Sequence, residues 1–395
     1  MIETLDAAAA LDRFLRLTTI FGPSGQEGAV AQAIITELKE AGVAENAIQF
    51  DDAHRRTKIE GQTGNLIVRV AGSTAGPATM LSAHMDTVPI CVGSQPQIDG
   101  DDVVSNSPAT GLGADDRAGC AAILTAAVEL LRSGRPHPPL VLCWFVQEEI
   151  GLQGSRYLDP SVLGEVDRAI NIDGGTVEKL TVGAIGGERM TINVHGIPAH
   201  AGLAPEEGVS AIVIAAKAIA ALHADGWLGN VQRPDGGEGK SNIGVIQGGD
   251  ATNVVTPAVQ VRAEARSHNP ETRQQIVAAI RQAFEAAAAG VTSANGKCGS
   301  IEFASHVDYE AFRLDDNAAS VTAAGKAVAA LGRKPMFSVS NGGVDANWLF
   351  RHGISAVTIG CGQRNVHTAE ERLHVPDYLD ACRVAMALAA GEYAA

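Results

Sequence analysis

The sequence has no organised cysteine motif. Its six cysteines are scattered without a CxxC pair, and most lie in apolar surroundings such as LVLCWFV; they are Cys91, Cys120, Cys143, Cys298, Cys361 and Cys382. This spacing argues against a disulfide framework or a zinc ribbon. It favours reduced thiols in the core of a cytoplasmic protein.

The sequence also lacks a long apolar run and an excess of positive charge. No run approaches the roughly 18 residues of a membrane span, and the N-terminus MIETLDAAAALDRF has no basic region followed by an apolar one. Thirty Lys and Arg against 45 Asp and Glu give a formal charge of −15, which repels nucleic acid and anionic membranes. We therefore expect a soluble cytoplasmic protein with no nucleic-acid or membrane partner.

Three common catalytic motifs are absent: the HExxH helix, the GxSxG elbow and the Walker loop. A serine nucleophile or a phosphate cradle therefore has no support. At 395 residues, with 46% hydrophobic and 19% charged residues, the chain is globular and long enough for two domains.

Helical and strand patterns alternate in the first half of the chain. Residues 5–18, 27–41 and 116–133 have helical patterns, and the short apolar runs NLIVRV, TMLSA, LVLCWFV and RAINI have the character of strands. Continuous apolar runs of this kind are typical of parallel sheets that are covered on both faces. The alternation predicts a layered α/β domain with a mostly parallel sheet.

The pattern changes after about residue 185. The order β-α-β-β-α-β that follows is that of a ferredoxin-like α+β unit, and the first pattern resumes after it. We therefore expect an inserted domain of residues 185–307 within a discontinuous domain of residues 1–184 and 308–395.

Five potential metal ligands lie at the ends of separate apolar runs or at a helix start: His84, Asp115, Glu149, Asp173 and His367. In an open α/β sheet, ligands bind beyond the carboxyl ends of the strands, so these residues should meet in one place. Two histidines and three carboxylates could hold a pair of divalent metals.

Each of these segments also has a simpler interpretation. Asp115 and Asp116 could cap a helix, and Glu148 with Glu149 could form a solvated acidic loop. Two like charges beside an apolar strand, however, are costly without a cation. If metals bind, the two oxygens of Asp115 suit a bridge, and one of the two glutamates would take a proton from metal-bound water. Asp86, two residues after His84, would face the same side of an extended segment.

Ten segments in order carry a resemblance over nearly the whole chain: GNLIV, SAHMDTVP, GADDRAGCAAIL, QEEIGLQGS, NIDGG, HAGLAPEEGVSAI, ATNVV, EARSHN, SNGGVDANW and VHTAEE. Together they resemble the M20 family of co-catalytic dizinc peptidases, and most closely its peptidase T-like (tripeptide aminopeptidase) branch.

The resemblance implies roles for the matched residues. His84 and Asp173 would hold one zinc, and Glu149 and His367 the other, with Asp115 bridging both. Glu148 would be the general base, Asp86 would orient His84, and the Asp115–Asp116 peptide bond would be cis. Cobalt or manganese would also suit these ligands.

The resemblance further implies that the inserted domain is a lid through which the protein forms a homodimer. The residues expected to contact substrate are His200, Asn253, Arg266, Asn341 and Asp345.

We therefore expect a zinc-dependent exopeptidase that cleaves short peptides through a metal-bridging water. Two alternatives remain at this stage. One is an N-acyl-amino-acid amidohydrolase or carboxypeptidase that uses the same dimetal site. The other is a non-catalytic metal- or peptide-binding protein, although such a protein would typically have lost a ligand or the base, and none is missing here. A purely structural protein would leave the acidic strand ends unexplained.

Overall fold

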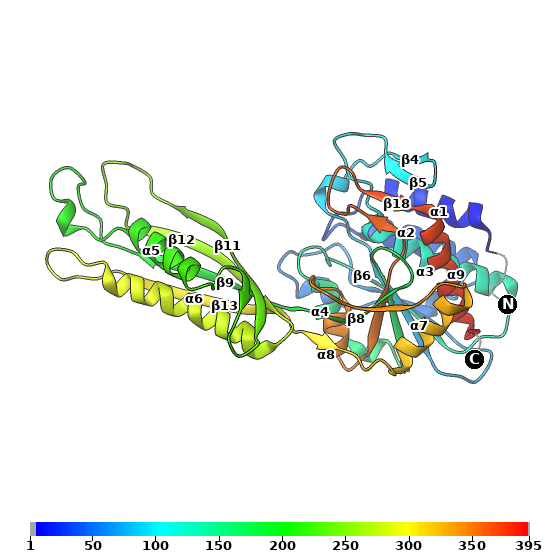
Figure 1. The fold of residues 1–395 in the computed structure, drawn as a ribbon. Coiled ribbons are helices and arrows are strands. Elements are labelled where there is room, and N and C mark those ends of the chain that lie inside the picture. Colours follow the sequence, from blue (N-terminus) through cyan, green and yellow to red (C-terminus); the bar gives the residue numbers. More distant parts are fainter. Residues whose placement is uncertain (1–4, 394–395) are drawn as a thin grey trace. The chain divides into compact units, whose positions relative to one another are not determined.

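The computed structural model describes residues 5–393. The chain forms two compact units: a large unit of Met1–Gly183 and Arg313–Ala395, and a small unit of Ala184–Phe312 (Figure 1). No helix within residues 5–393 is long and apolar enough to cross a bilayer.

The large unit is built on a nine-stranded sheet. Its strand order is β1 (Ile48–Phe50), β2 (Leu66–Val70), β6 (Leu140–Phe145), β3 (Thr79–His84), β7 (Arg168–Ile172), β16 (Ala356–Ile359), β8 (Lys179–Ala184) and β14 (Phe312–Arg313), and β15 (Met336–Ser340) also pairs with β8. The central strands β6, β3, β7 and β16 run parallel. Every residue of β3 and β6 is buried, as the apolar runs predicted. The layered α/β prediction is confirmed.

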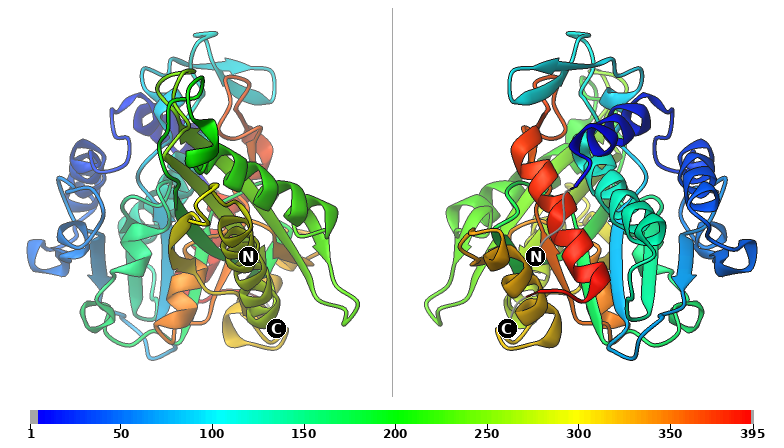
Figure 2. Two further views of the ribbon diagram at one scale, coloured as in Figure 1. Left: turned by 90° about the vertical axis from the view of Figure 1, so that its left-hand side faces the viewer. Right: turned by 90° about the vertical axis from the view of Figure 1, so that its right-hand side faces the viewer.

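Helices cover this sheet. The long ones are α1 (Ala7–Thr19), α2 (Gly28–Glu40), α3 (Ala114–Ser133), α7 (Ala319–Ala330) and α9 (Val375–Ala390), and the short ones are α4 (Gln153–Arg156) and α8 (Ala346–Arg351). The largely buried α3 packs on β3 and lies beside α1, α2 and α9 (Figure 2). Single 3-10 turns occur at Glu45–Ala47, Ala53–Arg55, Pro89–Cys91, Pro160–Val162 and Pro205–Glu207.

A second, four-stranded antiparallel sheet in the large unit was not predicted from the sequence. It has the order β17 (Gln363–Arg364), β18 (Arg372–His374), β5 (Asp102–Ser105) and β4 (Pro96–Asp99). Its strands are short and polar, so they have little hydrophobic periodicity. The turn between β17 and β18 carries His367, and Asn365 and His367 there have left-handed φ values of 53° and 65°. Such values are uncommon outside glycine and are typical of constrained functional loops.

The small unit is an antiparallel sheet packed against two helices. Its elements are β9 (Gly186–His195), α5 (Ala211–Ala224), β10 (Gly229–Gln232), β11 (Glu238–Gly248), β12 (Ala258–Ser267), α6 (Pro270–Gly290) and β13 (Ser300–Tyr309), with the strand order β10-β11-β12-β9-β13. Without β10 this is the ferredoxin-like arrangement that the sequence predicts. Strand β10 arises because the chain turns at the glycine-rich stretch DGGEG (residues 235–239), so that residues 229–232 pair with β11.

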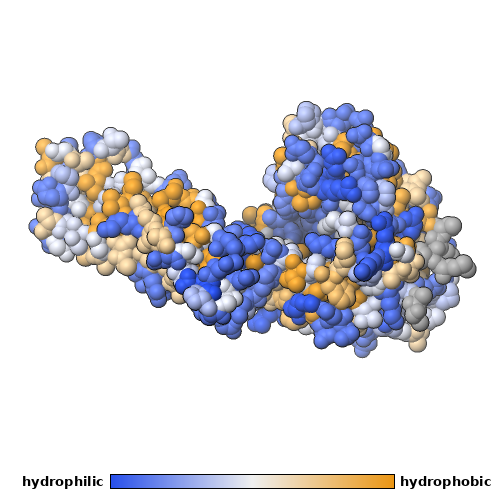
Figure 3. Space-filling view, in the orientation of Figure 1, coloured by the Kyte–Doolittle hydropathy of each residue, from blue (hydrophilic) through white to orange (hydrophobic). Residues whose placement is uncertain are grey.

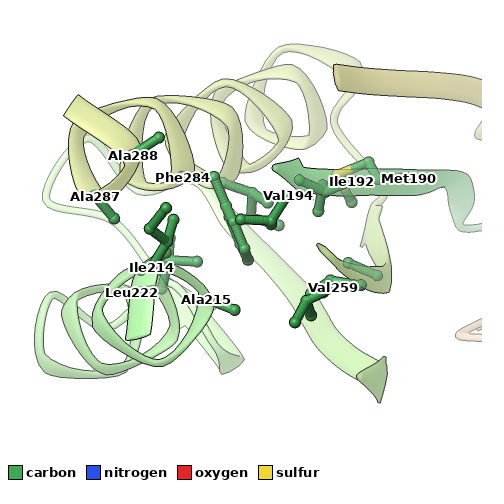
Figure 4. Close-up of a cluster of buried hydrophobic side chains, with 14 of the residues drawn as sticks. Met190, Ile192, Val194, Ile214, Ala215, Leu222, Val259, Phe284, Ala287 and Ala288 are labelled. Carbon is green, nitrogen blue, oxygen red and sulfur yellow. The ribbon is translucent and has the colours of Figure 1, made fainter. Parts of the chain in front are cut away.

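The core of the small unit is apolar. Phe284 of α6 and Ile214 of α5 meet Ile192 and Val194 of β9, and all four side chains are fully buried (Figure 4). Strand β13 continues to Tyr309 past a register shift, so the small unit ends at Phe312 rather than at residue 307.

Candidate metal centre

The parallel strands of the large unit bring the expected ligands to one edge. His84 ends β3, Asp173 directly follows β7, and Glu149 lies shortly after β6. Since these three strands are neighbours and run parallel, their carboxyl ends lie together. Asp115 enters the same region from the first turn of α3, and His367 enters it from the β17–β18 turn.

The Asp115 carboxylate lies between the two histidines. Its Oδ1 is 3.1 Å from His84 Nε2, and its Oδ2 is 3.3 Å from His367 Nε2. Glu149 Oε2 is 3.0 Å from the same nitrogen of His367. Ligand atoms of His84, Asp115 and Glu149 lie within 4.8 Å of one another, and so do those of His84, Asp116 and Asp173. All five expected ligands therefore lie in one cluster.

Asp115 and Asp116 face different partners. Asp116 Oδ1 accepts from Gly119 N at 3.0 Å and from Gln363 Nε2 at 2.8 Å, and its Oδ2 accepts from His84 N at 3.2 Å. The helix-cap interpretation therefore fits Asp116, whereas Asp115 is left to face the histidines. The peptide bond between them is cis, as the resemblance implies.

Asp86 connects two of the ligand segments. Its buried carboxylate accepts from Glu148 N at 2.9 Å, from Glu149 N at 3.2 Å and from the Ser24 hydroxyl at 2.6 Å. His84 Nδ1 is 3.1 Å from the Asp86 carbonyl oxygen and 3.5 Å from the carboxylate. The backbone of Asp86 is thus the nearer acceptor for His84, and its side chain holds the loop that carries the two glutamates.

The cluster contains more carboxylates than histidines, and this excess of buried acidic groups shifts the pKa values of its members. Burial, with neighbouring carboxylates, raises the pKa of Glu149 to about 7 and that of Asp173 to about 6. Burial also raises the pKa of Glu148 well above its usual range. Hydrogen bonds to Asp115 and Glu149 raise the pKa of His367 to about 10. For Asp115, burial opposes ionisation, but hydrogen bonds with His367 and His84 outweigh it and lower its pKa.

These residues fit a pair of divalent cations. Glu149 Oε1 is buried without a hydrogen-bond partner, which is costly for a carboxylate unless a cation or donor is supplied. Mixed imidazole and carboxylate donors suit zinc and related metals. Bound cations would replace the protons that the pKa shifts place on His367 and on the carboxylates.

Comparison with known proteins agrees with this chemistry. The model of peptidase family M20/M25/M40 matches residues 80–391. The chain belongs to this family. It is therefore a hydrolase that acts on peptide bonds.

Several M20 relatives match almost the full length of the chain. The uncharacterized protein YqjE of Bacillus subtilis (strain 168) is 32% identical over 380 residues, which cover 96% of each chain. Among solved structures, a tripeptidase from Staphylococcus aureus subsp. aureus mu50 has a TM-score of 0.88 at 30% identity and 99% coverage of both chains. Aminopeptidase PepT from Bacillus cereus ATCC 10987 has a TM-score of 0.84 at 31% identity and 98% coverage of both chains.

Two buried glutamates of this M20 peptidase were missed from the sequence. Glu27 Oε1 accepts from Gly25 N at 2.8 Å and from Gln147 N at 3.0 Å, and Gln147 has a left-handed φ of 54°. Glu27 therefore holds the residue that precedes Glu148. Glu371 accepts backbone hydrogen bonds on both sides of Ala114. The sequence signals were SGQE before α2 and the second glutamate of VHTAEE.

Two of the expected substrate residues lie in the large unit. Asp345, just before α8, is buried, and this burial raises the pKa of its carboxyl group to about 7. Asn341 is exposed, in the segment between β15 and α8.

The other three lie in the small unit. His200 and Asn253 are exposed and occupy neighbouring segments, since His200 forms a bridge with Val254 and Ala201 N donates to the Asn253 carbonyl at 2.9 Å. Arg266 lies near the other end of β12. There its guanidinium makes two hydrogen bonds to Glu264, at 3.1 and 3.0 Å. The structure therefore brings His200 and Asn253 together, with Arg266 apart from them.

Proposed function

We propose that the protein is a dizinc exopeptidase that removes the N-terminal residue from short peptides, like a tripeptide aminopeptidase. The observation that carries the proposal is the Asp115 carboxylate, which presents one oxygen to His84 and the other to His367. The full-length similarity to a tripeptidase and to PepT supports the substrate class.

Two cation positions share the ligands. His84 and Asp173 would hold one, Glu149 and His367 the other, and Asp115 both. When bound, the two cations lower the pKa of water to near neutrality and polarise the scissile carbonyl. Zinc suits this donor set best, and cobalt or manganese would also fit it.

Glu148 is the proposed general base. It would take a proton from the attacking water and pass it to the leaving amine. Two features support this role: the side chain is half-buried beside the ligand cluster, and its backbone N–H donates to the Asp86 carboxylate at 2.9 Å. Asp86 would therefore set the positions of both the base and the neighbouring ligand Glu149.

For the substrate, we propose that His200 stabilises the oxyanion of the tetrahedral intermediate and that Arg266 binds a carboxylate. In the free protein Arg266 is paired with Glu264, so a substrate carboxylate would compete for this guanidinium. Asn253 would help to hold the peptide, and Asn341 and Asp345 would shape the pocket wall.

We also propose that the small unit mediates homodimerisation. Helix α5 leaves Ile212 and Val213 about half exposed, and Figure 3 shows hydrophobic side chains on the visible surface of this unit. Apolar surface on a helix is typical of interfaces. Sedimentation measurements should give the mass of a dimer, and an Ile212→Glu variant should shift it toward the monomer.

The activity is tested with a tripeptide beside its N-acetylated and C-amidated forms. The chelated protein should be inactive, and added zinc should restore cleavage of the free and amidated peptides but not of the acetylated one. Cleavage of the acetylated form alone would instead establish the amidohydrolase alternative. Release of the C-terminal residue first, with the acetylated peptide still cleaved, would establish a carboxypeptidase. Two bound metals without turnover of any form would favour a binding protein.

A further inference from the structure

Glu371 is a buried carboxylate with three donors. Only 1% of the surface of Glu371 is exposed to solvent. Oε2 accepts from Gly113 N at 2.8 Å and from Cys91 Sγ at 3.2 Å, and Oε1 accepts from Asp115 N at 3.0 Å. A buried carboxylate is tolerated when its oxygens are hydrogen-bonded in this way. These contacts distinguish Glu371 from the exposed Glu370 beside it.

The position of Glu371 in the chain gives these contacts a consequence. It lies just before β18, four residues after His367 in the same hairpin. Its hydrogen bond to Asp115 N spans 256 positions of the chain. The Asp115 carboxylate in turn lies 3.3 Å from His367. Three links thus form a closed ring: the backbone from His367 to Glu371, the hydrogen bond from Asp115 N to Glu371, and the contact between the Asp115 and His367 side chains. The ring contains two of the proposed metal ligands.

There is little room for Glu371 to move. A Cβ atom added at Gly111 would lie 3.0 Å from Glu371 Oε2, 2.9 Å from Cys91 Sγ and 2.8 Å from the Thr368 carbonyl. The glycine therefore allows the backbone to pack directly against the carboxylate. In addition, Asp115 and Asp116 have non-helical dihedral angles, so the N–H groups that Glu371 accepts from belong to the irregular segment just before the regular part of helix α3.

We propose that Glu371 is a positioning residue that holds the Asp115 carboxylate opposite His367 and thereby sets the affinity of the second cation position, the one formed by Glu149, His367 and Asp115. This inference rests on the proposed dimetal site. Groups that orient metal ligands from behind typically contribute about 10–100-fold to metal affinity. The first position shares Asp115 but also has His84 and Asp173, to neither of which Glu371 is hydrogen-bonded, so it should depend less on Glu371 than the second position does.

The test is a Co²⁺ titration of the metal-free full-length protein, in which binding is measured by calorimetry and by visible absorption. The decisive variant is Glu371→Ala, which removes both carboxylate oxygens and with them the hydrogen bonds from Gly113 N and Asp115 N, whereas the amide oxygen of Glu371→Gln could still accept from Asp115 N. We expect the affinity for the first equivalent to change less than that for the second. The second should bind about 10–100-fold more weakly, with altered absorption bands.

Two control variants separate this role from general stability. Glu370→Gln makes the same charge change one residue away at an exposed side chain and should bind both equivalents normally. Cys91→Ala removes the third donor but leaves the link to Asp115 intact, and should also bind both. If Glu371→Ala does not fold, Glu371→Asp keeps the charge but has a shorter reach, and should show the same selective weakening.

Normal binding of both equivalents by a folded Glu371→Ala, even with a lowered melting temperature, would overturn the inference and leave the proposed function intact. A wild-type protein that binds a single equivalent would overturn both.

Discussion

Both units have an apolar core, but the expected functional residues of the two units are held in place in different ways. In the large unit, buried carboxylates grip the backbone of the ligand segments: Asp86 holds Glu148 and Glu149, Asp116 holds His84, and Glu371 holds Asp115. In the small unit, an apolar core supports the sheet, and His200 and Asn253 lie exposed in segments outside its strands. Metal ligands require precise placement, and hydrogen-bonded carboxylates provide it.

This difference predicts which substitutions should affect metal binding or catalysis and which should affect stability. Changes of charge or hydrogen bonding should act on the large unit and alter metal binding or catalysis with little loss of fold. Changes of packing in the core of the small unit should alter the stability of that unit without affecting the metal centre.

The largest effect should come from Glu148→Gln. Loss of the proton acceptor should lower kcat by about 10²–10⁴-fold, because general base catalysis typically contributes that much. Metal content and melting temperature should stay unchanged. The exposed Glu165→Gln provides a control with the same charge change. Steady-state kinetics beside metal analysis checks the prediction, and near-normal kcat in Glu148→Gln would exclude this residue as the base.

In the small unit, the corresponding test is Phe284→Ala. Phe284 is fully buried between α6 and the sheet, so its truncation should destabilise this unit by about 3–5 kcal/mol. Co²⁺ binding by the large unit should be unaffected. Denaturant unfolding followed together with Co²⁺ absorption tests both statements. A variant that loses metal binding while its small unit stays folded would show that the two units are not independent in this respect.

The positions of the metal ligands could be predicted from the sequence, because strand-length apolar runs locate the carboxyl ends of the strands in a parallel sheet. TMLSA before His84 and RAINI before Asp173 are such runs, and β3 and β7 are indeed parallel neighbours. The ferredoxin-like order of the insert was predicted by the same periodicity, and it is observed with β10 added.

The supporting carboxylates could not be found in this way. A single glutamate in a polar segment, such as Glu27 or Glu371, has the sequence character of a solvated side chain. Its burial arises only when distant parts of the chain close around it. The Arg266–Glu264 contact, in contrast, could have been anticipated, since residues two apart on a strand share a face.

A smaller effect is expected for Arg266→Lys. Lysine keeps the charge but cannot form the planar, two-bond fork to a carboxylate. If Arg266 binds substrate, KM should rise about tenfold, as expected for the loss of one charged hydrogen bond of about 1.5 kcal/mol, with kcat nearly unchanged. Kinetics with the free and C-amidated tripeptides checks this. The increase in KM should vanish for the C-amidated tripeptide if Arg266 binds the C-terminal carboxylate. An equal KM for both substrates, in the wild type and in Arg266→Lys alike, would contradict a role of Arg266 in binding that carboxylate.

A final expected effect is a pH dependence of the metal-free protein. The folded-state pKa of Glu149 rises from 4.5 to about 7, that of Asp173 from 3.8 to about 6, and that of His367 from 6.5 to about 10. A group with a raised pKa binds more protons in the folded state, so its stabilising contribution is lost as pH rises through that pKa. The lowered pKa of Asp115 acts in the opposite sense only in acid, because its contribution is lost below its unfolded value of 3.8.

The melting temperature of the metal-free protein should therefore fall between about pH 5 and pH 8. Zinc should reverse this trend, since cations replace the protons and bind more tightly as pH rises. The stabilisation by zinc should accordingly be larger at the upper end of that range. Thermal unfolding across the range, with and without zinc, tests both statements, and His367→Gln should flatten the metal-free slope above neutrality. A metal-free protein that becomes more stable over the same range would mean that the cluster is not strained by excess negative charge, and the electrostatic contrast between the two units would fail with it.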